Sequence, residues 1–205
     1  MVPNVHAAVF DLGGVLLDWN PEYLYSTLIP DESERTYFLS EVCPAEWNAE
    51  QDAGRPWGRA VAERAARFPG YADFIGAYHD RWDEMIAGPI PGMPEVLDEL
   101  RQAGIPLYVL SNISLAKWRD AVASWDFLGG LHGAVISGQE GVTKPAPAIY
   151  RTLLERYGLR PERTFFTDDL PRNIEAARAL GIDAEHFVDA ETTRKQLGRR
   201  GLLDG

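Results

Sequence analysis

Cysteine is almost absent from this chain of 205 residues, in which Cys43 is the single cysteine. A single cysteine excludes an internal disulfide and a thiolate-rich zinc site. A chain without disulfides fits a reducing compartment, and its first residues lack the basic region and apolar core of a secretion signal. We therefore expect a cytoplasmic protein in which Cys43 is a small buried side chain.

Basic residues and long hydrophobic runs are also scarce. Lys and Arg total 20 against 31 Asp and Glu, which gives a formal net charge of -11. This balance disfavours the broad positive surface that binding to a nucleic acid requires. No run of 18 apolar residues occurs, which argues against a membrane span. We expect neither nucleic acid nor a membrane as a partner, and an anionic substrate would need a local positive group, such as a lysine or a metal ion.

Five short apolar segments have the pattern of buried strands. They cover residues 6–10, 105–110, 133–137, 163–167 and 184–188. Helical patterns lie between the later segments, at residues 93–104, 147–158 and 170–181, and each ends at a glycine suited to a helix C-terminus. This alternation predicts an α/β fold with a doubly wound parallel sheet.

The alternation is interrupted between about Pro21 and Pro89, where we identify no strand. Segments 34–42, 56–68 and 71–86 instead place apolar residues at spacings of three and four, which favours helices. We predict an inserted all-helical cap subdomain over residues 19–89 and an α/β core over 1–18 and 90–205. Three prolines within residues 88–95 mark the return to the core. The sequence does not indicate an oligomeric state.

Polar residues follow the predicted strands at their carboxyl ends, where ligands bind in open parallel sheets. These residues are Asp11, Ser111, Asn112, Lys144, Asp168 and Asp169, and two glycines, Gly13 and Gly14, come shortly after Asp11. Carboxylates from two strands form an oxygen site suited to Mg²⁺ with substrate phosphate oxygens. An Asp can also act as a covalent nucleophile, and a lysine and a metal ion would offset its repulsion from a phosphate.

Four motifs in this order, VFDLGGVL, VLSN, GVTKPAPAIY and FFTDDLPRNIEAARALG, resemble those of the haloacid dehalogenase-like (HAD) hydrolase superfamily. The chain is similar to its members with a helical cap after the first motif, such as sugar-phosphate phosphatases of the alpha-glucose-1-phosphate type and the phosphatase domain of epoxide hydrolases. The resemblance implies a Mg²⁺-dependent phosphatase acting on a small phosphorylated metabolite.

The resemblance also implies a role for each motif residue. Asp11 would be the nucleophile that forms an aspartyl-phosphate, and the main-chain carbonyl of Gly13 would bind the metal. Lys144 would steady the nucleophile and the phosphate. Ser111 and Asn112 would bind the phosphate, and Asp168 and Asp169 would join Asp11 around the metal.

One departure from the family pattern has chemical consequences. Related phosphatases carry a second Asp, the general acid and base, two residues after the nucleophile, and this chain has Gly13 there. Asp18 is one candidate replacement. Ala146 replaces another family Asp that has no central catalytic role. Two other functions stay open: a metal-independent 2-haloacid dehalogenase, and a catalytically impaired relative that binds a phosphorylated ligand or a protein.

Structural explanations compete with the functional ones at several positions. Ser111 and Asn112 would also suit the N-terminus of the helix that follows them, and Asp168 and Asp169 that of a helix beginning near Pro171. Tryptophans of the predicted cap would either line a substrate pocket or pack in a core, with core packing the simpler role. These are Trp19, Trp47 and Trp57.

Overall fold

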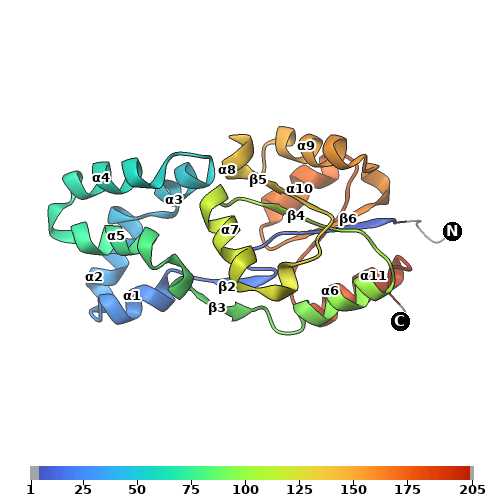
Figure 1. Ribbon diagram of the computed structural model, residues 1–205, viewed down its shortest axis with the longest axis horizontal. Coiled ribbons are helices and arrows are strands. Elements are labelled where there is room, and N and C mark those ends of the chain that lie inside the picture. Colours follow the sequence, from blue (N-terminus) through green and yellow to red (C-terminus); the bar gives the residue numbers. More distant parts are fainter. Residues whose placement is uncertain (1–4, 204–205) are drawn as a thin grey trace.

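The computed structural model describes residues 5–203, and its centre is a five-stranded sheet (Figure 1). The strands are β1 (Ala7–Phe10), β4 (Leu107–Ser111), β5 (Gly133–Ile136), β6 (Thr164–Asp168) and β7 (Asp183–His186). They lie in the order β5-β4-β1-β6-β7, and every neighbouring pair is parallel. The predicted α/β fold with a parallel sheet is confirmed, and each strand lies within a few residues of its predicted position.

Helices cover both faces of this sheet (Figure 1). On one face lie α6 (Met93–Gln102), α7 (Leu115–Ser124) and α11 (Ala190–Arg199), and on the other lie α9 (Pro147–Tyr157) and α10 (Pro171–Ala179). Strand β1 is buried on both sides, because Ala8 and Phe10 pack in the first core and Ala7 and Val9 in the second. Two covered faces explain why these strands are continuous apolar runs rather than alternating ones.

A helical insertion, residues 22–85, lies beside the sheet at the left of Figure 1. Its helices are α1 (Glu22–Leu28), α2 (Glu32–Tyr37), the π-helical turn Phe38–Val42, α3 (Ala45–Asp52), α4 (Trp57–Arg67) and α5 (Ala72–Asp80), with 3-10 turns at Pro69–Tyr71 and Trp82–Met85. Aromatic side chains form its interior. Trp57 stacks on Tyr78 with ring centres 6.0 Å apart, and Trp47 meets the same tyrosine edge-on at 5.3 Å. Trp47 and Trp57 therefore have the packing role that is the simpler of the two expected.

Two short strands join the helical insertion to the sheet domain. Strand β2 (Leu17–Trp19) pairs antiparallel with β3 (Ile86–Pro89), and Asp18 lies opposite Gly88. The prediction that no strand occurs up to Pro89 is wrong at β3. A segment of four residues that contains a glycine and a proline has no strand pattern of its own, and its pairing depends on a partner far away in the chain.

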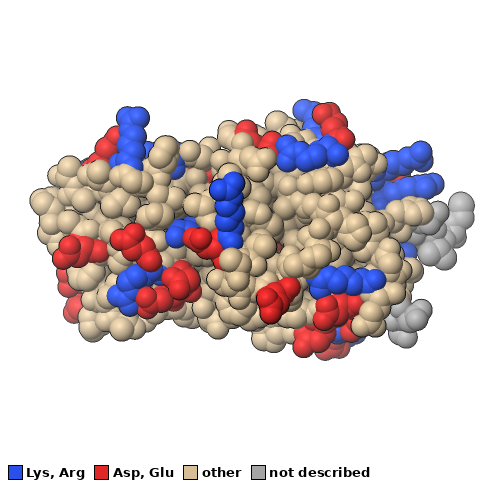
Figure 2. All heavy atoms as spheres, in the orientation of Figure 1, with Lys and Arg blue, Asp and Glu red and all other residues tan. Residues whose placement is uncertain are grey.

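The remaining elements are short. They are α8 (Ser137–Glu140) and 3-10 turns at Asp126–Leu128 and Pro161–Arg163. Within residues 5–203, every helix is too short or too polar to cross a membrane. Figure 2 shows acidic and basic side chains interspersed over one face of the molecule.

Candidate active site

Asp11 follows the last residue of β1, at the carboxyl edge of the sheet. Its main-chain amide donates to the carbonyl of Thr167 at 3.0 Å, which ties it to β6. Its carboxylate oxygen Oδ1 accepts from the amide of Leu12 at 2.7 Å. The carboxyl group is almost completely buried; burial raises its pKa, and the charge of Lys144 acts in the opposite direction. Asp11 is thus a shielded, fixed carboxyl group rather than a surface turn residue.

Lys144 is enclosed by oxygen atoms from three directions. Its Nζ lies 2.8 Å from Asp11 Oδ1 and 2.6 Å from Asp168 Oδ2, and it donates to the carbonyl of Leu110 at 2.8 Å. Burial disfavours the charged amine, but the two carboxylates outweigh that effect and raise the pKa of Lys144. The ammonium group therefore stays charged between the two acids.

Asn112 holds the loop that carries Lys144. Its Oδ1 accepts from the amide of Lys144 at 2.7 Å, and its Nδ2 donates to the carbonyl of the same residue at 3.0 Å. The neighbouring Ser111 is the last residue of β4 and is buried. Ser114, rather than either of these residues, is the N-cap of α7, and its hydroxyl accepts from the amide of Lys117. The alternative capping role of Ser111 and Asn112 is therefore wrong.

Asp168 is the last residue of β6, Asp169 follows it, and both lie near Asp11. Asp168 is fully buried, and its Oδ1 accepts from the amide of Leu170 and from Asn173 Nδ2, each at 2.9 Å. Burial and the charge of Asp168 raise the pKa of Asp169. Asp168 does contact the first turn of α10, as the alternative explanation predicted, but it also binds Lys144.

The three acids offer oxygen atoms within 4.8 Å of one another: one each from Asp11, Asp168 and Asp169. Carboxylate oxygens are the ligands that Mg²⁺ prefers, so this donor set fits that ion. Gly14 is needed for the approach of the third acid. Its φ is +73°, and a Cβ built there would lie 2.7 Å from Asp169 Oδ2.

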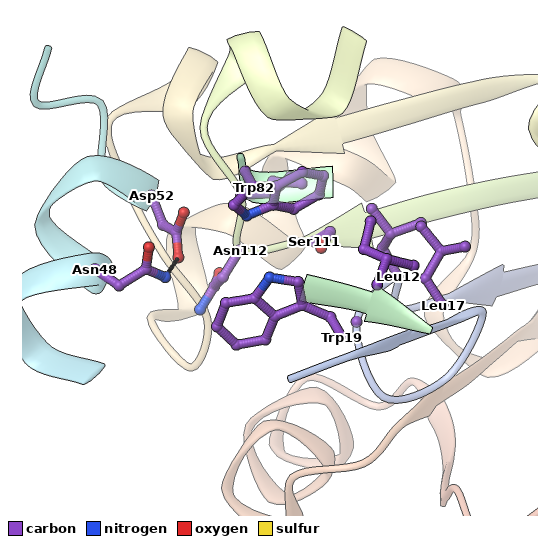
Figure 3. A pocket seen from close by; sticks show the side chains of 11 residues that line it. Leu12, Leu17, Trp19, Asn48, Asp52, Trp82, Ser111 and Asn112 are labelled. Carbon is purple, nitrogen blue, oxygen red and sulfur yellow. Dashed lines mark hydrogen bonds between the residues drawn. The ribbon is translucent and has the colours of Figure 1, made fainter. Parts of the chain in front are cut away.

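A small cavity of about 70 Å³ opens between this edge of the sheet and the helical insertion (Figure 3). It is lined on the sheet side by Leu12, Gly13, Ser111, Asn112 and Ile113. Leu17, Trp19, Asn48, Asp52, Trp82 and Ile86 line the rest of it. Trp19 therefore has the pocket-lining role, unlike Trp47 and Trp57. Asp18 is not among the lining residues, and its carboxylate accepts from the hydroxyl of Tyr23 at 2.8 Å.

Asp52, the last residue of α3, is the acidic lining residue that the sequence analysis did not identify. In Figure 3 it points into the cavity beside Asn48, whose Nδ2 donates to its Oδ2 at 2.9 Å. One signal was available: a carboxylate at the C-terminal end of a helix is disfavoured by the helix dipole and needs another reason to be there. Asn173, which lies within a recognised motif, was also missed as a partner of Asp168.

Comparison with known proteins gives the class of this fold and site. A model of the haloacid dehalogenase-like hydrolases matches residues 5–181. The sesquiterpene phosphatase astK of Aspergillus oryzae is 27% identical over 96% of this chain and 97% of its own length. A phosphorylated carbohydrates phosphatase of Thermotoga maritima is 22% identical over 90% of this chain and 85% of its own. The chain belongs to the haloacid dehalogenase-like hydrolase family.

Solved structures agree with this assignment at the level of the fold. A HAD family enzyme of Bacteroides thetaiotaomicron, crystallised with magnesium and inorganic phosphate, superimposes with a TM-score of 0.68. The match covers 90% of this chain and 95% of the other, at 20% identity. The protein is therefore a hydrolase with phosphatases among its relatives, as the motifs predicted.

Proposed function

We propose that this protein is a Mg²⁺-dependent phosphatase that hydrolyses a small phosphomonoester through an aspartyl-phosphate on Asp11. The observation that carries the proposal is the grouping of three acids around a buried lysine at the carboxyl edge of the sheet. Asp11, Asp168 and Asp169, with the main-chain carbonyl of Gly13, would hold the metal. A bound Mg²⁺ would neutralise charge on the phosphoryl oxygens.

Four side chains would carry out the reaction and bind the phosphate. Asp11 attacks phosphorus in line and the ester oxygen leaves; water then hydrolyses the aspartyl-phosphate. Lys144 stays charged because of its two carboxylate partners, so it offers a positive group to the phosphoryl oxygens in a protein with a net charge of -11. Ser111 and Asn112 border the same cavity and would donate hydrogen bonds to the phosphate.

The walls of the cavity favour two classes of leaving group. Trp19 Nε1 and Asn48 Oδ1 are buried polar atoms without a hydrogen-bond partner in the described part of the chain, and the hydroxyls of a sugar phosphate would satisfy both. We therefore place sugar phosphates first. The apolar walls formed by Leu17, Trp82 and Ile86 favour a hydrocarbon group instead, and the relative named a sesquiterpene phosphatase makes a terpenyl monophosphate the second candidate.

A phosphatase panel with and without Mg²⁺ tests this proposal. It should contain sugar phosphates, a terpenyl monophosphate and p-nitrophenyl phosphate, and Asp11→Asn is the control. We expect release of phosphate only with Mg²⁺ and only by the parent protein, with a phosphorylated Asp11 detectable by mass spectrometry after rapid acid quenching. Equal turnover by Asp11→Asn would remove this residue from the mechanism.

The same experiment separates the two other functions left open by the sequence. Release of chloride from chloroacetate in metal-free buffer would identify a 2-haloacid dehalogenase. No turnover of any substrate, together with saturable binding of a phosphorylated compound measured by calorimetry, would identify a binding protein.

A further inference from the structure

The reaction needs a proton donor for the leaving oxygen, and the position of Gly13 does not supply one. General acid and base assistance is worth about 10²- to 10⁴-fold in rate. A Cβ built on Gly13 meets no atom within 4 Å, so the space that a side chain would enter is open. Gly13 lines the cavity beside the acid cluster, and another group that reaches this cavity would meet the same leaving oxygen.

Asp52 is the titratable side chain that lines this cavity from the helical insertion. Figure 3 shows it entering from α3 with Asn48, on the side of the cavity where Asn112 lies. Asn48 fixes one carboxyl oxygen by a hydrogen bond of 2.9 Å. Its carboxyl group has no other side-chain partner in the described part of the chain, and the main-chain amide of Ser114 also contacts it. Asp52 is thus oriented by these two contacts and lines the cavity.

The main chain at Asp52 is attached to the sheet domain. The hydroxyl of Ser137, the first residue of α8, donates to the carbonyl of Asp52 at 2.5 Å. The same hydroxyl accepts from the amide of Ile113, a cavity residue, at 2.9 Å. A second contact joins Trp57 Nε1 to the hydroxyl of Ser114 at 3.0 Å. These bonds hold the insertion against the catalytic edge, so the position of Asp52 is defined relative to Asn112.

We propose that Asp52, contributed by the helical insertion, is the general acid and base of this enzyme and replaces the carboxyl group that relatives carry at the position of Gly13. The inference rests on the phosphatase function proposed above. It assigns to the insertion a direct part in the chemistry, because the reactive proton would come from α3 rather than from the loop that follows β1.

The proton affinity of this group suits the task. Burial raises the pKa of Asp52 to about 7, the negative charge of Asp11 acts in the same direction, and the main-chain amide of Ser114, the N-cap of α7, opposes both. Asn48, its neighbour on α3, is uncharged. A general acid works best with a pKa near the working pH, where both of its protonation states are populated.

Protons and electron pairs balance over the two steps. In the first, an Asp11 oxygen bonds to phosphorus, the bond from phosphorus to the ester oxygen breaks, and that oxygen takes the proton of Asp52 and leaves as an alcohol. In the second, the Asp52 carboxylate takes a proton from water while the water oxygen bonds to phosphorus. The bond from phosphorus to Asp11 then breaks, which releases phosphate and restores both side chains.

The test compares two kinds of leaving group in Asp52→Asn, which keeps the shape of the side chain and loses the proton. An alkyl phosphate needs a proton on its leaving oxygen, and we expect its kcat/KM to fall by about 10²- to 10⁴-fold. The aryl group of p-nitrophenyl phosphate leaves as a stable anion, so its kcat/KM, which reports the steps up to departure of the leaving group, should change by less than about tenfold. Its kcat should fall, because hydrolysis of the aspartyl-phosphate still needs the base. This retained activity also shows that the variant is folded. Glu46→Gln, an exposed acid on the same helix, is the matched control and should leave both rates unchanged.

A rescue experiment tests the replacement directly. Gly13→Asp in the Asp52→Asn background places a carboxyl group where the chain has open space, and we expect it to restore at least part of the lost alkyl phosphatase activity. The parent protein gives a second measurement: its kcat/KM for the alkyl phosphate should decline as the pH rises through about 7, and its kcat/KM for p-nitrophenyl phosphate should not.

The outcomes distinguish this inference from the proposed function. Equal losses of kcat/KM with the two substrates in Asp52→Asn, or no loss with either, would refute a proton-transfer role to the leaving group while leaving the phosphatase intact. If Asp52→Asn does not fold, matching pH profiles for the two substrates in the parent protein would refute it. A parent protein that hydrolyses neither substrate in Mg²⁺ would refute the proposed function, and this inference with it.

Discussion

Replacing Lys144 with methionine should destabilise the protein strongly in the absence of metal. The Lys144 side chain is 1% exposed, and its carboxylate partners Asp168 and Asp11 are 0% and 10% exposed. Methionine keeps most of the apolar stem but removes the charge. Two carboxyl groups then face each other in a buried site without a cation between them.

The expected loss follows from the burial of all three groups. Removing one partner of a buried ion pair costs about 3–5 kcal/mol, because it leaves uncompensated charge in a medium of low dielectric constant. Domains are stable by only about 5–15 kcal/mol, so the variant would lose a large share of its free energy of unfolding. With a urea m-value of about 2 kcal/mol/M, the unfolding midpoint should fall by about 2 M.

Lys117→Met is the matched control, because Lys117 is also a buried lysine. Its Nζ donates to the carbonyl of His79 at 2.8 Å and lies 3.4 Å from Asp120, whose side chain is 59% exposed. Loss of these contacts should cost about 1 kcal/mol, or about 0.5 M in the urea midpoint. Both variants would be unfolded in urea with EDTA and followed by tryptophan fluorescence. An equal shift of the two midpoints would show that the two buried carboxylates do not increase the loss of stability caused by removing the charge of Lys144.

Three further predictions concern the same region. Gly14→Ala should weaken Mg²⁺ binding about 10- to 100-fold in a calorimetric titration, since its Cβ would displace Asp169, whereas Gly13→Ala should bind as the parent does. Between pH 4 and 8, the free energy of unfolding of the parent should fall by about 4 kcal/mol more than that of Asp52→Asn, because the unfolded carboxyl loses its proton near pH 3.8 and the folded one near 7. Parallel pH profiles of the two proteins would contradict this. Ser137→Ala should lower the stability by about 1 kcal/mol in urea unfolding and speed hydrogen exchange in α3, and unchanged exchange there would argue against its contact with Asp52.

The sheet domain was largely predictable because its signals are local. Each buried strand is a short apolar run, and α9 and α10 are followed within two residues by Gly158 and Gly181, which have positive φ angles of 62° and 82°. Parallel order then places every strand's carboxyl end at one edge, so the motif residues could be expected to meet. Strands β2 and β3 lack such signals, because three or four residues show no periodicity and their pairing joins distant parts of the chain.

Asp52 shows why part of the site could not be predicted. It is one of 31 acidic residues, and no spacing connects it with Asp11. Its place in the cavity follows from contacts between the insertion and the sheet domain, such as those of Ser137 and Trp57. Neither contact leaves a pattern in the sequence, since each joins single residues from separate segments.

The amino-acid sequence by itself determined the strands of the parallel sheet, several of the helices that cover them and the identity of the acids at the strand ends, because hydrophobic periodicity and glycine positions act over a few residues. Only the tertiary structure decided which face of the insertion lies against that edge of the sheet and which of its side chains line the cavity there. That choice depends on packing and hydrogen bonds between segments far apart in the chain, which are settled only when the whole molecule is folded.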